Sequence, residues 1–421
     1  MHRKTTLSNG MRVITDRIQG TQAVTALVLV KAGSRYEHKQ INGISHFLEH
    51  MFFKGANRYK NAKAVSEAID SVGGEFNAFT SKEYAGYYVK TAAQNMRLAM
   101  DVLSDMMLNA RFDQEEIEKE RGVIMEEFNM YQDTPMYQVA WNFERGMFGD
   151  QPIGWDEVGT KDVIKALQRD DFVAYKESLY VPEAMVISLA GAVDHDEVVA
   201  MVQELFPMEA RKATGKFLPF EAGLPTRQRV SFQTKKTEQA HVVCGVPGYP
   251  EEHPDHYVLK VLSSILGGNM SSRMFLAVRE EKGLAYYISS GTEDYLDTGT
   301  FYTRAGVDVT RIKDAIKAIV EEYKKIAGEV VPESELKKAK EFLKGKLVLS
   351  LEDSESVAQM HALNELLYDK IKTLADISAN IDKVTAADVQ RVAENILKED
   401  LIQLAVIGPY EDKAEFEALL N

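Results

Sequence analysis

Two copies of one sequence pattern, a helix followed by an apolar strand, divide the chain into halves. Shifting the sequence by 217 positions places Gly191 on Gly408, and these glycines end the apolar stretches 184–191 and 401–408. A repeat of this length is typical of two domains with similar folds rather than of a solenoid of short units. The length of 421 residues also fits two domains of ordinary size. The matched positions are few, so chance similarity is the alternative.

A linker is expected between the halves, because residues 209–229 combine two prolines and two glycines without regular apolar spacing. We predict an N-terminal domain over residues 1–210, a linker over 211–229 and a C-terminal domain over 230–421. Strands followed by helices, without strict alternation, indicate an α+β fold. Each domain is therefore expected to be a mostly antiparallel sheet packed against helices, and the two domains are expected to be structurally similar.

The composition excludes several classes of protein. A formal net charge of −14 opposes binding to nucleic acid and to anionic membranes. We find no apolar run of the roughly 18 residues that a membrane helix needs, and the opening residues lack the apolar core of a signal peptide. These features predict a cytoplasmic protein with no nucleic-acid or membrane partner. The single cysteine, Cys244, rules out an intrachain disulfide and a cysteine metal cage, and its apolar neighbours predict a core residue.

The segment His46-Phe47-Leu48-Glu49-His50 carries the clearest chemical signal. Histidines four residues apart lie one turn apart on the same face of a helix, where one zinc ion can bind both. Glu49 lies on the flank of this face and can reach a water molecule that a zinc protease must deprotonate. This order is the reverse of H-E-x-x-H and defines the inverzincin motif. The alternative is a pair of core histidines, but the apolar arc of the helix is already supplied by Ile44, Phe47, Leu48 and Met51.

A catalytic zinc site needs a third protein ligand, and the helix expected over residues 114–131 offers several glutamates. At 100° per residue, Glu120 and Glu127 fall on or beside the apolar stripe of this helix, whereas Glu126 points to the opposite side. A carboxylate on a buried stripe is costly unless it meets a cation or a metal. Glu120 and Glu127 are therefore the candidates, and Glu126 is expected at the surface. The alternative is that both are flanking charges whose stems cover apolar surface.

His253 and His256 lie three residues apart without a suitable adjacent carboxylate, and we interpret them as loop residues.

Four motifs occur in an order that resembles the pitrilysin and mitochondrial-processing-peptidase family of inverzincins, in its short bacterial form. They read GSRYE…NGISHFLEHMFFKG, then GGEFNAFTSKEYAGYYVKT, then ERGVIMEEF, and in the second half SSRMFLAVREEKGLAYYISSG. The resemblance covers essentially the whole chain. It implies that His46, His50 and Glu127 bind zinc, that Glu49 is the general base and that Glu120 orients the ligands.

The resemblance also implies substrate-binding residues in both halves. The segment 74–81 matches an edge strand to which the substrate backbone adds as a further strand, with Asn77 and Ala78 close to the scissile bond. Arg279 and Tyr286 match an arginine and a tyrosine that reach the substrate near the metal, where Tyr286 can stabilise the oxyanion. The alternative for segment 74–81 is an ordinary turn that leads into a hairpin. The alternatives for Arg279 and Tyr286 are a charge at the end of a helix and a ring packed on a sheet.

The resulting expectation is a zinc endopeptidase that hydrolyses unfolded peptides or processes presequence-like segments. The N-terminal domain is expected to be catalytic and the C-terminal domain to bind substrate. One Zn²⁺ per chain is expected, because the second half contains no H-x-x-E-H. The family also implies a homodimer, or a heterodimer with a paralogue. The alternatives are a catalytically silent peptide-binding subunit of the same family and a metal-dependent amidohydrolase that acts on small molecules.

Overall fold

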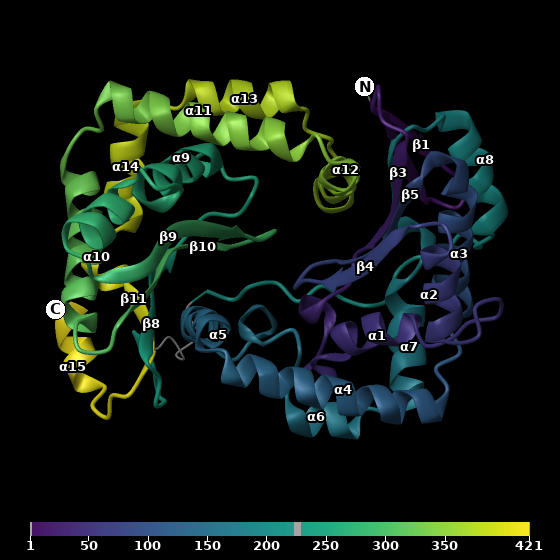
Figure 1. Ribbon diagram of the computed structural model, residues 1–421, viewed down its shortest axis with the longest axis horizontal. Helices are drawn as coiled ribbons and strands as arrows, with labels where there is room; N and C mark the ends of the chain where they lie inside the picture. The colour runs from purple at the N-terminus through teal and green to yellow at the C-terminus, as the bar shows by residue number, and fades with distance from the viewer. Residues whose placement is uncertain (1, 223–228, 421) are drawn as a thin grey trace. The chain divides into compact units, whose positions relative to one another are not determined.

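The computed structural model describes residues 2–222 and 229–420, which form two compact units (Figure 1). Unit 1 comprises Met1–Phe128, Trp155–Leu218 and Leu349–Lys372, and unit 2 comprises Asn129–Gly154, Pro219–Val348 and Thr373–Asn421. Each unit therefore takes a segment from the other half of the chain. The domain bounds drawn from the sequence at residues 210 and 230 stay a prediction.

Unit 1 is built on a six-stranded sheet in the order β1-β2-β6-β3-β5-β4. Its strands are β1 (His2–Thr6), β2 (Arg12–Arg17), β3 (Ala23–Val30), β4 (Glu75–Thr80), β5 (Ala85–Ala92) and β6 (Met185–Gly191). Its helices are α1 (Ile44–Phe52), α2 (Ala62–Asp70), α3 (Met96–Asn109), α4 (Gln114–Asp133), α6 (Lys161–Ala166), α7 (Arg169–Leu179), α8 (His195–Leu205) and α12 (Ser354–Tyr368), and α4 continues into unit 2.

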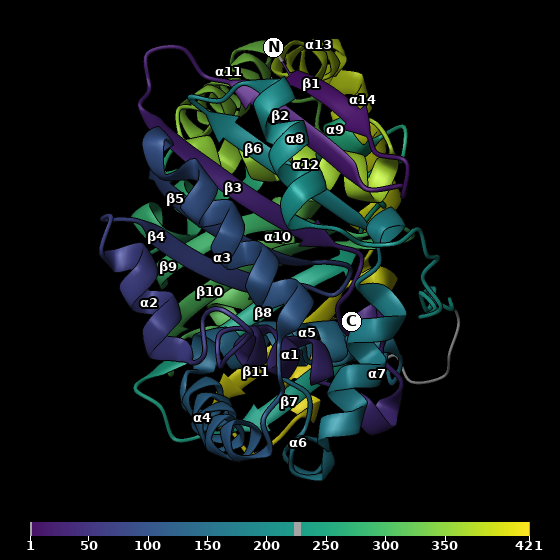
Figure 2. The same ribbon diagram turned by 90° about the vertical axis from the view of Figure 1, so that its right-hand side faces the viewer.

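Alternating side chains of the sheet in unit 1 enter two separate cores. On β3, Ala26 and Val28 pack in the core formed with α1, α3 and α8, whereas Leu27 and Leu29 pack against α12. Helices α3 and α8 lie over the first face (Figure 2), and α12 contacts β3 and β6 on the other. Because both faces of the sheet are covered, β3 and β6 are buried along almost their whole length. This burial explains their continuous apolar runs in the sequence.

Unit 2 has a five-stranded sheet in the order β7-β11-β8-β10-β9. Its strands are β7 (Val230–Thr234), β8 (Gln239–Pro247), β9 (Ala285–Asp294), β10 (Gly299–Asp308) and β11 (Gln403–Gly408). Its helices are α5 (Pro135–Phe148), α9 (His256–Gly267), a π-helix (Phe275–Glu281), α10 (Ile312–Gly328), α11 (Glu333–Ser350), α13 (Leu374–Lys383), α14 (Ala386–Ile396) and α15 (Ala414–Glu417). None of the helices in the described part of the chain is both long and apolar enough to cross a membrane.

The two sheets share one topology. Strands β2-β6-β3-β5-β4 correspond in order to β7-β11-β8-β10-β9, and in each sheet only the first of these pairs is parallel. The preceding helices match as well, since capping boxes at Gln168/Asp171 and Thr385/Asp388 begin α7 and α14 and lie 217 residues apart. The predicted α+β fold with two similar, mostly antiparallel domains is confirmed.

Each sheet is closed on one face by a helix from the opposite half of the chain. Helix α12 packs on β3 and β6 in unit 1, and α5 packs on the corresponding strands β8 and β11 in unit 2. Neither half of the chain thus contains all the elements of a complete unit.

A fragment that ends at residue 222 should therefore expose the sheet face that α12 covers. Ile14, Leu27, Leu29, Val186 and Ala190 of this face are buried in the intact chain. We expect the fragment to bind a hydrophobic dye and to melt without cooperativity, because buried apolar surface is the main stabilising contribution. A synthetic peptide of residues 349–372 should lower the dye signal, and a scrambled peptide of the same composition should not. A cooperatively folded fragment that ignores the peptide would show that α12 is dispensable for unit 1.

Cys244 lies in β8 and is fully buried. Burial raises the pKa of its thiol to about 12, so the reactive thiolate is absent at neutral pH. The prediction of a core residue is confirmed.

Candidate metal centre

The N-terminus of α1 is held by a buried carboxylate from outside the helix. Gly43 precedes α1 with φ 97°, and a Cβ atom there would lie 2.8 Å from the carbonyl oxygen of Val158, so only glycine fits. The amides of Gly43 and Ser45 each donate to Glu37 at 2.8 Å, and the side-chain amide of Asn42 donates at 3.0 Å. Burial raises the pKa of Glu37, while these donors oppose the rise by stabilising its carboxylate. Sequence reasoning assigned Glu37 no role, although it ends the GSRYE motif.

Replacing Glu37 by alanine should destabilise the protein strongly. The change leaves the amides of Gly43 and Ser45 at the start of α1 buried without an acceptor, and two orphaned donors together cost about 2–6 kcal/mol. The free energy of unfolding in urea measures the effect, with Glu209→Ala at an exposed position as the control. A loss as small as that of the control would mean that Glu37 does not hold the helix.

His46, His50 and Glu127 converge on one point in unit 1. The Nε2 atoms of His46 and His50 lie 3.3 Å apart. Oε1 of Glu127 lies 3.6 Å from Nε2 of His46, and Oε2 of Glu127 lies 3.5 Å from Nε2 of His50. Ligands about 2.1 Å from a tetrahedral zinc ion are separated from one another by about 3.4 Å. These contacts are close to the spacing of ligands around one zinc ion, and one atom from each of the three residues lies within 4.8 Å of the others.

Glu120 orients His50. Its Oε1 accepts a hydrogen bond from His50 Nδ1 at 2.8 Å, and Lys54 Nζ contacts its Oε2 at 2.6 Å. Burial opposes the charged carboxylate, but the hydrogen bonds from His50 and Lys54 outweigh burial, and the pKa of Glu120 is lowered. An imidazole that donates from Nδ1 presents a lone pair on Nε2, the atom directed toward His46 and Glu127. Glu126, on the opposite side of α4, is exposed as predicted.

Glu49 completes an anionic group around His46. Its Oε2 accepts a hydrogen bond from Thr80 Oγ1, at the end of β4, at 2.6 Å. Burial lowers the pKa of His46, but the hydrogen bond and charge of Glu127 and the charges of Glu49 and Glu157 outweigh it, so the pKa is raised. Three carboxylates that favour a charged imidazole also favour a bound cation. Thr80 and Glu157 were not identified from the sequence, although Thr80 lies within the quoted second motif.

Asn77 and Ala78 lie on β4, which in the described part of the chain pairs only with β5 and is an edge strand of this sheet. Asn77 is exposed, Ala78 is half-buried, and β4 packs against α1. An edge strand presents main-chain donors and acceptors to an incoming chain. The substrate role of these two residues stays a prediction.

Arg279 and Tyr286 belong to unit 2. Arg279 lies in the π-helix, where its guanidinium stacks over the Phe275 ring at 4.6 Å. Tyr286 is 73% exposed on β9, the edge strand that corresponds to β4 of unit 1. Their roles at the substrate also stay predictions.

A second group of possible ligands lies in unit 2, where one atom each of Glu251, His256 and Asp294 lies within 4.8 Å of the others. Glu251 lies 3.3 Å from Nε2 of His256, whereas Asp294 lies 3.8 Å from Nδ1. The shortest contacts thus involve different nitrogens of the ring, and the imidazole lies between two carboxylates. The interpretation of His256 as a loop residue was wrong, because it begins α9 and is 4% exposed. Its nearest carboxylate partner on another element, Asp294, is 38 positions away and could not be found from local spacing.

The site in unit 1 has the arrangement of a metal centre: two histidines and a glutamate face one another, and a further glutamate lies beside them. It lies in a fold of two similar units. The family model described as insulinase (peptidase family M16) matches residues 12–156, and the model described as peptidase M16 inactive domain matches residues 166–343. A protein of Streptomyces coelicolor named as an uncharacterized zinc protease is 37% identical, over 98% of this chain and 90% of its own length. A Bacillus subtilis protein named in the same way is also 37% identical, over 97% of this chain and 98% of its own. The chain belongs to peptidase family M16, and the resemblance inferred from the motifs is confirmed.

Solved structures show the same fold at lower identity. A protease from Helicobacter pylori superimposes with a TM-score of 0.90 at 23% identity and covers 97% of this chain and 99% of its own. A putative M16-like peptidase from Alicyclobacillus acidocaldarius gives a TM-score of 0.86 at 19% identity, with 97% and 98% covered. At these low identities, the two structural similarities establish the fold of the chain and nothing about its activity.

Proposed function

We propose that the protein is a zinc-dependent endopeptidase that hydrolyses unfolded peptides or presequence-like segments. The proposal rests on the convergence of His46 Nε2, His50 Nε2 and both oxygens of the Glu127 carboxylate, with contacts of 3.3 to 3.6 Å. These residues would hold one Zn²⁺ per chain, and the names of the relatives as zinc proteases support this metal. Zinc content measured together with cleavage of an unstructured fluorogenic peptide tests the proposal.

Bound zinc supplies Lewis acidity, which acidifies water and polarises a peptide carbonyl. Glu49 supplies the proton transfer: its carboxylate takes a proton from the attacking water and delivers it to the nitrogen of the leaving amine. The hydrogen bond from Thr80 holds that carboxylate in place beside His46. Lys54 and Glu120 hold His50 in the tautomer that leaves Nε2 able to bind a metal.

Replacing Glu120 by glutamine should weaken metal binding without abolishing it. The amide is a poorer acceptor for His50 Nδ1 and loses the ion pair with Lys54, and losses of such outer partners cost about 10–100-fold in metal affinity. Competition with a chromophoric chelator measures the zinc dissociation constant. Glu118→Gln, at an exposed position on the same helix, is the matched control. Equal affinities in the two variants would rule out an orienting role for Glu120.

The substrate is proposed to bind as an extended strand along β4, with Asn77 and Ala78 near the scissile bond. Arg279 would hold a substrate carbonyl and Tyr286 would stabilise the oxyanion. The edge position of β4 and the exposed hydroxyl-bearing ring of Tyr286 support these roles.

We also propose that the chain acts as a homodimer or as a heterodimer with a paralogue. Light scattering on the zinc-loaded protein tests the homodimer, for which the mass should be twice 47.3 kDa.

The competing function is a silent subunit that binds peptides. The inactive-domain model matches only residues 166–343, whereas the whole H-x-x-E-H motif lies in the other match. Peptide binding without cleavage by the zinc-loaded protein would favour the silent subunit.

A further inference from the structure

A cavity of 240 Å³ lies within unit 1, beside the C-terminal ends of α3 and α7. Its lining combines three methionines with three charged residues, namely Met107, Met185 and Met208, and Lys176, Glu177 and Arg211. Met107 and Met185 are buried, whereas Glu177 and Arg211 are exposed. The cavity thus has an apolar interior and a charged mouth.

Lys176 contributes to this cavity a charge that no acidic side chain neutralises. Its Nζ donates a hydrogen bond to the carbonyl oxygen of Leu108 at 3.0 Å and lies 5.9 Å from the centre of the Phe112 ring. Within residues 2–222 and 229–420, Lys176 forms no ion pair with a carboxylate, and its side chain is only half-buried. An ammonium group has three donors, so two remain for a ligand.

The surroundings of Lys176 destabilise its charge. Burial lowers the pKa of the amine to about 8, the charge of Glu177 opposes the shift, and the charge of Arg211 adds to it. At pH 7 the amine is therefore still protonated, in a place where an ammonium is less stable than in water. Two of the three charged residues of the cavity are cations, and an anion bound beside them would stabilise both.

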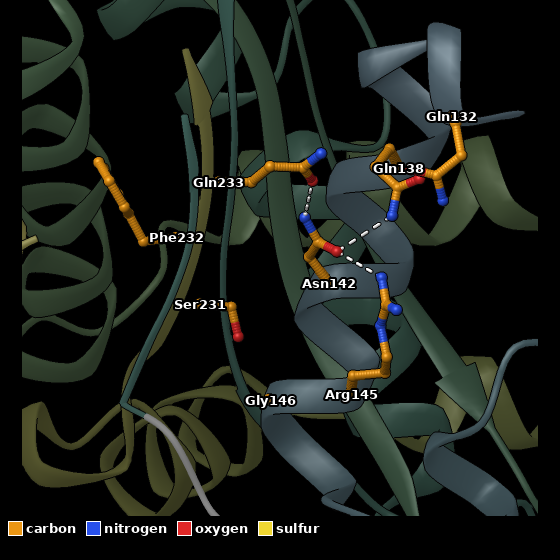
Figure 3. Close-up of a pocket in the computed structure, with 8 residues that line it drawn as sticks. All are labelled: Gln132, Gln138, Asn142, Arg145, Gly146, Ser231, Phe232 and Gln233. Atoms are coloured by element: carbon orange, nitrogen blue, oxygen red, sulfur yellow. Dashed lines mark hydrogen bonds between the residues drawn. The ribbon is translucent and has the colours of Figure 1, made fainter. Parts of the chain in front are cut away.

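A larger cavity in unit 2 shows the contrast (Figure 3). There, the Asn142 side chain accepts hydrogen bonds from Gln138 and Arg145. It also donates a hydrogen bond to Gln233. The guanidinium in that cavity is thus already held by a neighbouring side chain, whereas the ammonium of Lys176 has only a main-chain carbonyl. The cavity in unit 1 is therefore the better site for an anion.

The methionines indicate the chemistry of the rest of the ligand. A dry apolar cavity of about 150 Å³ holds a benzene molecule. A cavity of 240 Å³ therefore has room for such a ring together with a small polar group. Methionine sulfur makes favourable contacts with aromatic rings, and the three methionines border the cavity from α3, from β6 and from the segment after α8. An aromatic ring that carries a carboxylate fits both parts of the lining.

We propose that this cavity binds a small aromatic carboxylate. The ring packs against Met107, Met185 and Met208, and the carboxylate accepts hydrogen bonds from the ammonium of Lys176 and the guanidinium of Arg211. One nitrogen of Arg211 donates to the carbonyl oxygen of Glu177 at 2.7 Å, which leaves other donors of the guanidinium for the ligand. The site is separate from the metal centre, whose residues lie on α1 and α4.

Magnetic resonance of the protein with isotope-labelled methionine methyl groups tests this site. Phenylacetate is the probe, and phenylacetamide, a neutral molecule of the same shape, is its control. We expect phenylacetate to shift the signals of the three cavity methionines with saturation, and phenylacetamide to bind about tenfold more weakly, because hydrogen bonds to charged groups are the stronger ones. Substitution of each methionine by leucine assigns its signal.

Three results would overturn the proposal. The first is the absence of a saturable shift at millimolar phenylacetate, and the second is equal affinity for phenylacetate and phenylacetamide. The third is a shift at Met51 of α1 in place of the cavity methionines, which would put the carboxylate at the metal centre.

Variants of the charged residues test the proposed contacts. Lys176→Met removes the ammonium and keeps an unbranched stem, and its affinity for phenylacetate should fall about tenfold. Lys165→Met, at an exposed position on α6 outside the lining, should bind as the wild type does. If Lys176→Met does not fold, Arg211→Gln, at an exposed position, should weaken binding of phenylacetate and leave that of phenylacetamide unchanged. Wild-type affinity for phenylacetate in a folded Lys176→Met protein, or in Arg211→Gln where that variant is used instead, contradicts the proposed contacts.

Discussion

Replacing Glu127 by glutamine is expected to remove zinc from the protein and to abolish peptide hydrolysis, whereas replacing Glu126 leaves both unchanged. The two residues are neighbours of identical chemistry, but only Glu127 faces His46 and His50, within 3.6 Å of each Nε2. An uncharged amide is a poor zinc ligand, and the loss of affinity should exceed the roughly 100-fold upper bound for residues that only orient ligands. Elemental analysis after dialysis and a peptide hydrolysis assay measure the two effects.

Glu126→Gln is the control, because it makes the same chemical change one position away on the exposed side of α4. Zinc retained in Glu127→Gln and lost in Glu126→Gln would show that the helix faces were assigned wrongly. Zinc retained in both would place the third ligand elsewhere.

Replacing Glu49 by glutamine is expected to separate metal binding from turnover. The Glu49 carboxylate accepts a hydrogen bond from Thr80 and is not among the three groups that converge on the metal position. Zinc content should therefore stay at the wild-type level. Loss of a general base typically costs about 10²–10⁴-fold in kcat, and KM should change little.

Thr80→Val offers a graded comparison, since it removes the hydroxyl that holds Glu49 but leaves the carboxylate. A smaller loss of kcat than in Glu49→Gln is expected, again with zinc retained. Wild-type kcat in Glu49→Gln would exclude Glu49 as the base.

The repeat and the helix faces were predictable because both depend on local spacing. Capping boxes 217 residues apart mark equivalent helix starts in the two units. The period of 3.6 residues separates Glu120 and Glu127 from Glu126. The exchange of α5 and α12 between the two halves was not predictable, because an apolar helix face does not specify which sheet covers it.

The supporting residues of the site were missed for the same reason. Glu37 lies only six residues before Gly43, yet a carboxylate in a loop carries no sign that it turns back to cap a helix. Thr80 and Glu157 reach Glu49 and His46 only through the tertiary fold. Lys54 lies one turn beyond His50, but its partner Glu120 is on another helix. Local patterns thus identified the groups expected to bind metal, and long-range packing determines what orients them.

We propose that one zinc ion bound by His46, His50 and Glu127 enables peptide hydrolysis. The protein is incubated with a peptide library, and cleavage sites are identified by mass spectrometry. The assay is run on the protein as purified, after removal of metal by a chelator, and after return of zinc. Cleavage should disappear with the metal and return as zinc content reaches one per chain. Cleavage that persists in the metal-free protein, or its absence in the zinc-loaded protein, would show that zinc at this centre does not drive hydrolysis.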